Sequence, residues 1–318
     1  MIQVHRYDPN TSLLWDAFVA DCWNGTFLAT RKYLAYHKDR FIDQSLVFTD
    51  EGGRWLGVLP AACSMQSDVV SSHPGITFGG VLHGGALQGP VMLEVLKKAI
   101  DMYARNGFRH FQYKAIPAIY HRYPCEDDEY ALFRLGAHLY RTDLLSVVNL
   151  LSQAPIQARD QARLRRLARQ RIDFDQGVQY LPAMWSILEE QLHRNHGAMP
   201  THNLAEIQDL SSRFPDRIQC TVALQQGRLA AATITYHFDQ VVHGQYITAT
   251  NQGRNLDSSA AIISYLITKA RNAGGSWFDF GNSNERDGQC LNEGLHHFKK
   301  RFGSTGLTQR FYQIDLDE

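Results

Sequence analysis

The chain has 318 residues, 44% of them hydrophobic, which is long enough for two domains of ordinary size with their own hydrophobic cores. Lysine plus arginine and aspartate plus glutamate number 32 each, so no global field draws the protein to DNA or to an anionic membrane. No segment approaches the roughly 18 apolar residues of a membrane-spanning helix, and the N-terminus lacks the pattern of a signal peptide. We therefore expect a cytoplasmic protein without a transmembrane segment.

Cysteine and histidine spacing gives no support for a disulfide framework or a metal site. The five cysteines are odd in number and include no CxxC pair, so we expect reduced thiols. His193 and His196 form an HxxH pair, but no HExxH motif or nearby carboxylate at ligand spacing completes a zinc site. We therefore expect no bound metal.

The N-terminal region predicts two helices and holds one candidate for acid–base chemistry. Apolar residues recur at helical spacing over 12–21, and a second helix begins near Thr30. His37 lies on this second helix beside aromatic residues, and the ordinary pKa of histidine allows it to act near neutrality. A packed or surface histidine is the alternative interpretation. Arg40 follows it and is a candidate substrate contact.

A hairpin, a glycine-rich loop, a helix and a strand complete the first half. Apolar runs at 46–48 and 55–63 flank an acidic turn that ends in two glycines, which predicts a hairpin. Residues 71–89 carry six glycines but match neither phosphate-binding motif, so a phosphate loop and a set of turns both remain open. An amphipathic helix over 93–105 leads to a strand over 108–114.

A short internal repeat indicates duplication. The triplet Ala-Arg-Asn occurs at 104–106 and again at 270–272, each time between an apolar helix and a strand. The surrounding order of elements is similar in both halves, which indicates two copies of one α/β unit. We expect an N-terminal domain over 1–153, a basic linker helix over 154–177, and a C-terminal domain over 178–318 that carries the active site.

The expected linker is unusually basic. It contains six arginines, and Asp160 is its only acidic residue before Asp173. Two interpretations remain open: a solvated linker helix, or a phosphate-facing surface for a nucleotide or RNA. The arginines are Arg159, Arg163, Arg165, Arg166, Arg169 and Arg171.

The second half predicts a mixed sheet around one helix. Three antiparallel strands precede a loop over 248–257, a helix over 258–271 and a strand over 277–280. Because the loop leads into a helix N-terminus, its amides favour an anion there. Asn251 and Arg254 are therefore candidate contacts to a donor phosphate. The three strands are expected at 218–224, 229–238 and 241–248.

The stretch from Trp277 to Gly303 collects polar residues at a strand end. An aromatic strand passes into a polar loop, and apolar residues at helical spacing predict a helix over 291–302. Polar loops on a rigid scaffold often carry catalytic side chains, although a solvated loop that caps a core strand is the alternative. We take this stretch as the expected site. Its candidates are Asn282, Ser283, Asn284, Glu285, Asn292 and Lys299.

This order of elements resembles the GNAT acyltransferase core, and its duplication resembles the FemABX-related branch, including BioF2-like proteins. The resemblance covers nearly the whole chain, most specifically FDFGNSNERDGQCLNEGLHHFKKRFG, with support from HRNHGAMPTH and NGTFLATRKYLAYHKDRF. It implies an α/β (α+β) fold of two tandem GNAT-like domains, each a mixed, largely antiparallel sheet flanked by helices. It also implies transfer of an acyl or aminoacyl group to an amine, commonly on a peptidoglycan or surface-polysaccharide precursor.

Single positions follow the family pattern only in part. The C-terminal Phe-Lys pair of the family falls on Phe298 and Lys299, which implies contact with a substrate phosphate or the charged intermediate. Acyl-CoA-dependent GNAT enzymes carry (Q/R)xxGx(G/A) before the central helix, whereas this chain has Asp257 where a glycine is expected. A family lysine falls at His37. Arg194, in HRNHGAMPTH, is a further candidate substrate contact.

Two donors and two classes of function remain open. The donor is acyl-CoA or a charged tRNA, neither of them a tightly bound cofactor, and the acceptor is a small or nucleotide-linked molecule, with no DNA partner. Acyl transfer needs a base, charge for the oxyanion and alignment of the substrates. We expect Lys299 to supply charge and Glu285, or else His37, to act as base in a direct attack. The alternative is a non-catalytic binding module for a nucleotide-sugar or acyl-carrier ligand.

Overall fold

The computed structural model describes residues 1–197 and 199–316, which fold into two compact units. This division differs from the expected one. The chain enters the second unit before residue 153, the expected linker lies wholly inside that unit, and the C-terminal strand returns to the first unit. The first unit is Met1–Asp143, Arg286–Gln289 and Thr308–Glu318; the second is Leu144–Glu285 and Cys290–Leu307.

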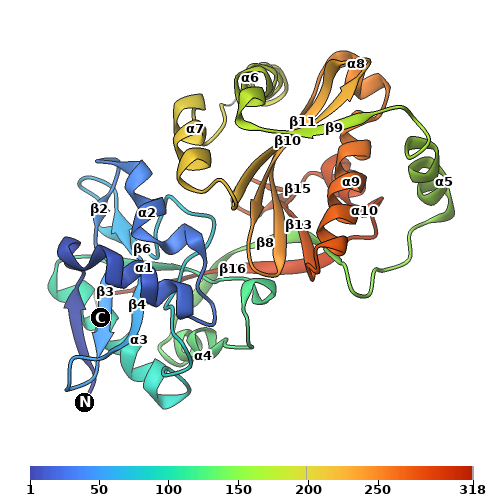
Figure 1. Cartoon of the computed structure of the whole chain (residues 1–318). Coiled ribbons are helices and arrows are strands. Elements are labelled where there is room, and N and C mark those ends of the chain that lie inside the picture. The colour runs from blue at the N-terminus through green and yellow to red at the C-terminus, as the bar shows by residue number, and fades with distance from the viewer. Residues whose placement is uncertain (198, 317–318) are drawn as a thin grey trace. The chain divides into compact units, whose positions relative to one another are not determined.

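The first unit contains two sheets (Figure 1). Strands β1 (Gln3–Arg6), β3 (Leu46–Thr49) and β4 (Trp55–Leu59) form an antiparallel sheet, and the β3–β4 hairpin confirms the prediction. In the other sheet, β6 (Val69–Ser71) and β7 (His110–Lys114) are parallel and need a crossover, which helix α3 provides. The other elements here are β2 (Ile42–Asp43), β5 (Ala62–Cys63) and β16 (Thr305–Asp315), with helices α1 (Ser12–Asp21), α2 (Arg31–Leu34), α3 (Pro90–Arg105) and α4 (Asp127–Arg134).

Helix α3 forms much of the first core. Its apolar residues recur every three or four positions, so they lie on one face of the helix and pack against the aromatic residues of β7. Alternate β7 residues, Phe111 and Tyr113, are buried toward this face. The buried α3 residues are Met92, Val95, Leu96, Ala99 and Tyr103.

The second unit is built on one mixed sheet. Its strand order is β8, β13, β12, β11, β10, β9. Neighbouring strands are antiparallel except for β12 and β13, which are parallel and are connected through helix α9. The mixed, largely antiparallel architecture is confirmed. The bounds are β8 (His138–Asn149), β9 (Asp173–Gln176), β10 (Ile218–Gln225), β11 (Arg228–His237), β12 (Val241–Ala249), β13 (Trp277–Asn282) and α9 (Ser258–Asn272).

The two parallel strands pair over a short length. Val241–His243 of β12 pair with Trp277–Asp279 of β13. Beyond this segment β12 continues beside β11 to Ala249, while β13 passes into a bulge beside β8. The bulge ends the regular ladder at a sheet interior, a position where irregular backbone often carries function.

Helices cover both faces of this sheet. Ile247 and Ala249 of β12 pack with α9, whereas Tyr246, which precedes Ile247, meets Trp185 of helix α6, as strand alternation requires. In Figure 1, α6 and α7 lie on one side of the sheet, and α9 and α10 on the other. Their bounds are α6 (Leu181–His196), α7 (Leu204–Arg213) and α10 (Glu293–Lys300).

The expected basic linker is part of the second unit. Only Ala158–Leu167 is helical (α5), and it packs on α9. The chain then forms β9, the edge strand that pairs with β10, so the segment contributes to the sheet. Within residues 1–197 and 199–316, no helix is both long and apolar enough to cross a membrane.

Candidate active site

Lys299 is held inside the second unit at the end of β13. Helix α10 is capped by Asn292, whose side chain accepts a hydrogen bond from the Leu295 amide at 3.0 Å. Lys299 is only 4% exposed, and its Nζ donates to the carbonyl oxygen of Gly281 at 3.0 Å and to that of Asn282. Burial lowers the pKa of Lys299 to about 8, while the nearby charge of Asp279 acts in the opposite direction.

A buried histidine and aspartate lie at the same strand end. His243 of β12 and Asp279 of β13 are direct partners in the parallel register, and His243 Nδ1 lies 2.9 Å from Asp279 Oδ2. Phe278 and Phe280 are buried in the core beside α9, so alternation places Asp279 on the opposite face. Asp279 is 1% exposed. The carboxylate therefore fixes the orientation of the imidazole.

Gly281 connects these three groups. Its amide donates to Asp279 Oδ1 at 2.7 Å, and its carbonyl oxygen accepts from Lys299. Gly281 has φ +69°, and a β-carbon there would lie 3.2 Å from Cε1 of His243. Both the left-handed backbone and the close approach of the ring favour glycine. Lys299, Asp279 and His243 thus form one cluster, which we call the Lys299 cluster.

Three of the other polar residues predicted in this stretch form hydrogen bonds within the chain. Glu285 is exposed and accepts a hydrogen bond from Asn292 Nδ2 at 2.9 Å. Asn284 Oδ1 accepts from the Leu144 amide at 2.7 Å. Among the described residues, no hydrogen bond or ion pair joins Glu285 to Lys299.

Ser283 and Phe298 are both close to this strand end. Ser283 is 2% exposed, and its Oγ has no hydrogen-bond partner within the part of the chain that the structure describes. Phe298 packs on the second core, with its ring 5.5 Å from that of Phe302. Phe298 therefore supports the helix that presents Lys299.

An acidic residue lies at the N-terminus of α9. Asp257 immediately precedes the helix with φ +60°, a conformation that favours glycine, and its carboxylate forms an ion pair with Arg163 of α5. A carboxylate at this position opposes the binding of another anion at the helix N-terminus.

Three further predicted contacts lie on helix surfaces. Asn251 and Arg254 are exposed on α8 (Asn251–Asn255), and their side chains hydrogen-bond to each other. Arg254 also donates to the Ala249 carbonyl oxygen at 3.3 Å. Arg194 is exposed on α6 and pairs with Glu190 one turn earlier.

His37 and Arg40 belong to the first unit. His37 is 4% exposed, with Nδ1 3.0 Å from the Leu34 carbonyl oxygen and Nε2 2.9 Å from that of Gly75. Its ring also lies against that of His73, with centroids 5.0 Å apart. Arg40 is exposed, with its guanidinium 5.9 Å from the centre of the Tyr36 ring.

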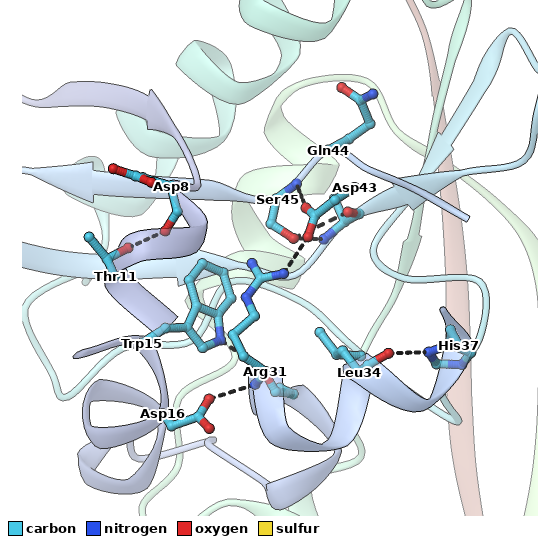
Figure 2. A network of polar contacts seen from close by, with 12 residues as sticks. Asp8, Thr11, Trp15, Asp16, Arg31, Leu34, His37, Asp43, Gln44 and Ser45 are labelled. Carbon is cyan, nitrogen blue, oxygen red and sulfur yellow. Dashed lines mark hydrogen bonds and ion pairs between the residues drawn. The ribbon is translucent and has the colours of Figure 1, made fainter. Parts of the chain in front are cut away.

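The short helix that leads to His37 is anchored by Arg31 (Figure 2). Figure 2 shows the Arg31 side chain beside Trp15 and reaching toward Asp43. Its NH1 lies 2.5 Å from Asp43 Oδ2, and its guanidinium carbon lies 3.4 Å from the centre of the Tyr7 ring and 3.8 Å from that of Trp15. The Arg31 amide donates to Asp16 Oδ1. These contacts explain why α2 is ordered despite its short length.

The glycine-rich loop of the first unit binds a cation through its carbonyl groups. Lys114 Nζ donates to the carbonyl oxygens of His73 at 3.1 Å, Pro74 at 3.3 Å and Ile76 at 2.6 Å, and His37 approaches that of Gly75. Burial lowers the pKa of Lys114 to about 8, and the charge of Arg141 adds to this. A phosphate loop needs converging amides. The phosphate interpretation is therefore wrong for residues 73–76.

Replacing Lys114 by methionine tests this arrangement. We expect the free energy of unfolding to fall by about 2 kcal/mol, because the loss of a charged donor to three carbonyl groups outweighs the relief of no longer burying the charge. Urea denaturation measures the change. Lys97→Met, on the exposed side of α3, is the control and should change stability by less than about 0.5 kcal/mol. Equal effects of the two substitutions would contradict the role of Lys114.

The side chains of the described residues give little support for a reactive thiol or a metal site. Burial raises the pKa of Cys125 and that of Cys220 to about 12, so neither forms a thiolate near neutrality. Over residues 1–197 and 199–316, no group of three histidine, cysteine, aspartate or glutamate side chains could hold a metal ion.

The comparisons with known proteins agree with this architecture. Residues 157–300 match the family model described as Acetyltransferase (GNAT) domain. These residues form a GNAT acetyltransferase domain. In this GNAT domain, β12, α9 and β13 are the parallel strand–helix–strand segment around which the Lys299 cluster is built. No curated protein matches the sequence significantly.

Solved structures share the fold over the whole chain. FemX has a TM-score of 0.71 at 10% identity and covers 98% of this chain and 97% of its own. L-PGS from Bacillus licheniformis has a TM-score of 0.63 at 12% identity, covering 99% and 94%. A tandem GNAT protein from the clavulanic acid biosynthesis pathway has a TM-score of 0.56 at 10% identity, covering 100% and 99%. The tandem GNAT fold and the FemABX-like architecture predicted from the sequence are confirmed.

Two members of the Lys299 cluster were not predicted from the sequence. His243 and Asp279 are 36 positions apart and meet only through strand pairing. One signal was present: a lone aspartate between two phenylalanines in a strand is a buried carboxylate, which needs a partner.

Proposed function

We propose that this chain is an N-acyltransferase that moves an acyl or aminoacyl group to an amine by direct attack at the Lys299 cluster. The observation that carries the proposal is the buried ammonium of Lys299, held at the end of β13 beside a buried histidine–aspartate pair. A cation in a water-poor site stabilises a developing oxyanion far more than it would in water. The match of residues 157–300 to a GNAT domain supports the same class of reaction.

Each residue of the Lys299 cluster has a separate role in the proposed reaction. The amine nitrogen forms a bond to the donor carbonyl carbon while Lys299 stabilises the negative charge on the carbonyl oxygen. Asp279 accepts the Nδ1 hydrogen bond of His243 and so orients the imidazole, which receives the amine proton. The bond to the leaving group then breaks, and the leaving group departs with the electron pair.

Glu285 remains the other proposed base. It lies on β14 (Asn284–Glu285), the strand that directly follows the bulge, and it is a carboxylate within the same loop. Its exposure and its hydrogen bond to Asn292 favour a role in ordering the turn. His243 is buried beside an oriented carboxylate and is the better candidate.

We propose a donor other than acyl-CoA, with aminoacyl-tRNA as the first choice. The ion pair between Asp257 and Arg163 at the start of α9 supports this, because it places a carboxylate where the pyrophosphate of coenzyme A would bind. For the acceptor we propose an amine on a nucleotide-linked precursor of the cell envelope, either of peptidoglycan or of a surface polysaccharide. The similarity to the fold of FemX and L-PGS is compatible with such substrates.

Asp257→Gly tests the donor assignment. We expect affinity for coenzyme A to rise about tenfold, because removing one opposing charge at a helix N-terminus is worth roughly 1 kcal/mol. Stability should change by less than about 1 kcal/mol, since glycine relieves the left-handed backbone while a surface ion pair is lost. Asp257→Asn is the control that removes the charge and keeps the side-chain volume. Fast acyl-CoA turnover by the unmodified chain would contradict the assignment.

A binding module without activity is the second candidate function. The ion pair at the start of α9 favours a binding module. If this helix N-terminus does not accept the phosphates of acyl-CoA, the domain need not transfer a group from any donor. One experiment separates the transferase from the binding module. The purified chain is incubated with a panel of acyl-CoAs and aminoacyl-tRNAs and with amine acceptors, and mass spectrometry detects any amide formed. Amide formation that is lost in Lys299→Ala supports the transferase. Ligand binding without amide formation supports the module.

A further inference from the structure

Arginine side chains are concentrated on α5 and in the turn after it, at an outer edge of the second unit (Figure 1). Residues 158–171 contain six arginines and one aspartate, an excess of five positive charges in a chain whose formal net charge is zero. Five of the six arginines are exposed, and among the described residues their side chains form no hydrogen bond or ion pair. These five, which we call the arginine face, are Arg159, Arg165, Arg166, Arg169 and Arg171.

Neither α5 nor α9 supplies an exposed carboxylate to the arginine face. Asp160, the one acidic residue of α5, is 7% exposed, so its carboxylate lies on the buried side of the helix. Helix α9, on which α5 packs, contains no acidic residue from Ser258 to Asn272. Asp257, just before α9, pairs with Arg163, the one arginine of the segment outside the arginine face. The arginines of the face therefore repel one another, and a bound anion relieves this repulsion.

The apolar residues of α5 belong to the hydrophobic core, which argues against a membrane as the partner. An amphipathic helix binds a bilayer by burying an apolar face among the lipids. Leu167 of α5 is 3% exposed and is part of the second core, and Leu164 packs against that core. Helix α5 therefore has no apolar face left for a bilayer.

The composition of the segment fits the phosphates of a nucleic-acid helix. Every positive charge in residues 158–171 is a guanidinium group, which binds phosphate in a planar, two-point geometry. Proteins that bind single strands stack the bases on aromatic side chains, and residues 158–171 contain no aromatic residue. Contacts to the backbone of a double helix need no such side chains.

We propose that the arginine face binds the phosphates of an RNA helix. The charge, burial and composition of α5 point to a nucleic-acid helix, and that the helix is RNA rests on the aminoacyl-tRNA donor proposed above. Leu164 of α5 and Phe298 of α10 pack on the same core, so the arginine face belongs to the unit that carries Lys299. The contacts are to the RNA backbone, and we expect little dependence on base sequence.

Fluorescence anisotropy with an RNA hairpin tests the proposal, because the full chain can bind it without any transfer reaction. If each arginine of the face contacts one phosphate, the affinity should fall about 10²–10³-fold between about 50 and 200 mM salt. The double substitution Arg165→Gln and Arg166→Gln should weaken binding about tenfold or more at low salt and reduce the slope of log Kd against log salt by about 2. Arg165→Lys with Arg166→Lys keeps both charges and should keep the slope.

A matched control removes two exposed arginines elsewhere. Arg105→Gln with Arg228→Gln changes the net charge equally and should leave the affinity for the hairpin within about twofold. Equal losses in the two double variants would overturn the arginine face as the binding surface. A single-stranded RNA of the same length that binds as tightly as the hairpin would also overturn the proposal. So would tighter binding to phosphatidylglycerol vesicles than to the hairpin at equal phosphate concentration.

The binding surface and the transfer reaction are tested separately. In transfer assays with aminoacyl-tRNA, Arg165→Gln with Arg166→Gln should raise KM for the tRNA and leave kcat unchanged, because neither side chain belongs to the Lys299 cluster. Transfer from acyl-CoA alone would overturn the proposed donor. Absence of hairpin binding by the unmodified chain would overturn the arginine face, whatever the donor.

Discussion

Lys299→Ala should lower kcat/KM of the transfer reaction by about 10²–10³, the usual effect of removing one group that stabilises an oxyanion. The reason is that Lys299 is the buried cation at the end of β13, held by two carbonyl oxygens. Steady-state kinetics with the donor found in the panel measures the change. Lys300→Ala, on the exposed neighbour in α10, is the control and should be close to the unmodified chain.

The pH dependence identifies the role of Lys299. Because its pKa is lowered to about 8, the ammonium is charged below that pH and loses its proton above it. If the charge stabilises the oxyanion, kcat/KM should fall as pH rises through about 8. Lys299→Arg, which stays charged, should lose this decline whatever its absolute rate. A rate that instead rises through pH 8 would mean that Lys299 acts as a base.

Stability separates this role from a purely structural one. The pKa of Lys299 in the folded chain lies below its ordinary value of 10.5, so the unfolded chain binds the proton more tightly. Below about pH 8 the burial of the charge therefore costs about 3 kcal/mol, and this cost disappears as pH rises from about 8 to 10.5. Lys299→Met removes the cost but leaves two carbonyl groups unpaired, so the free energy of unfolding at pH 7 should change by less than about 2 kcal/mol. A much larger loss would indicate a structural role.

His243→Gln and Asp279→Asn should each lower kcat/KM by about 10²–10⁴, the range for loss of general base catalysis. His243 receives the amine proton in the proposed reaction, and Asp279 holds its ring through the 2.9 Å contact. Steady-state kinetics at a fixed pH measures kcat/KM of both variants against that of the unmodified chain.

Two substitutions serve as comparisons for this base. His237→Gln changes another histidine of the same sheet, whose pKa is lowered to about 4 by burial, and should have little effect. Glu285→Gln should change kcat/KM by less than about twofold, because the exposed side chain only orders the turn through Asn292. If Glu285→Gln abolished activity while His243→Gln retained it, Glu285 would be the base.

Local patterns predicted many of the elements of this protein. Helical spacing located α3, α9 and α10, and strand alternation with turn residues located the β3–β4 hairpin and the strands β10 to β13. The long strands β8 and β16 were missed. Each runs through both units, so neither carries one uniform burial pattern along its length.

The amino-acid sequence by itself determined the tandem arrangement of similar sheets, the cation at Lys299 and the unusual acid at Asp257. Tertiary structure alone decided which groups meet Lys299. Residues near in sequence share a helix or a turn, as Glu285 and Asn292 share one stretch, but His243 reaches Asp279 through pairing of two parallel strands with a whole helix between them. That contact exists only in the folded sheet. A strand determines which face of the sheet each of its side chains points to, but which strand lies beside it depends on the packing of the entire unit.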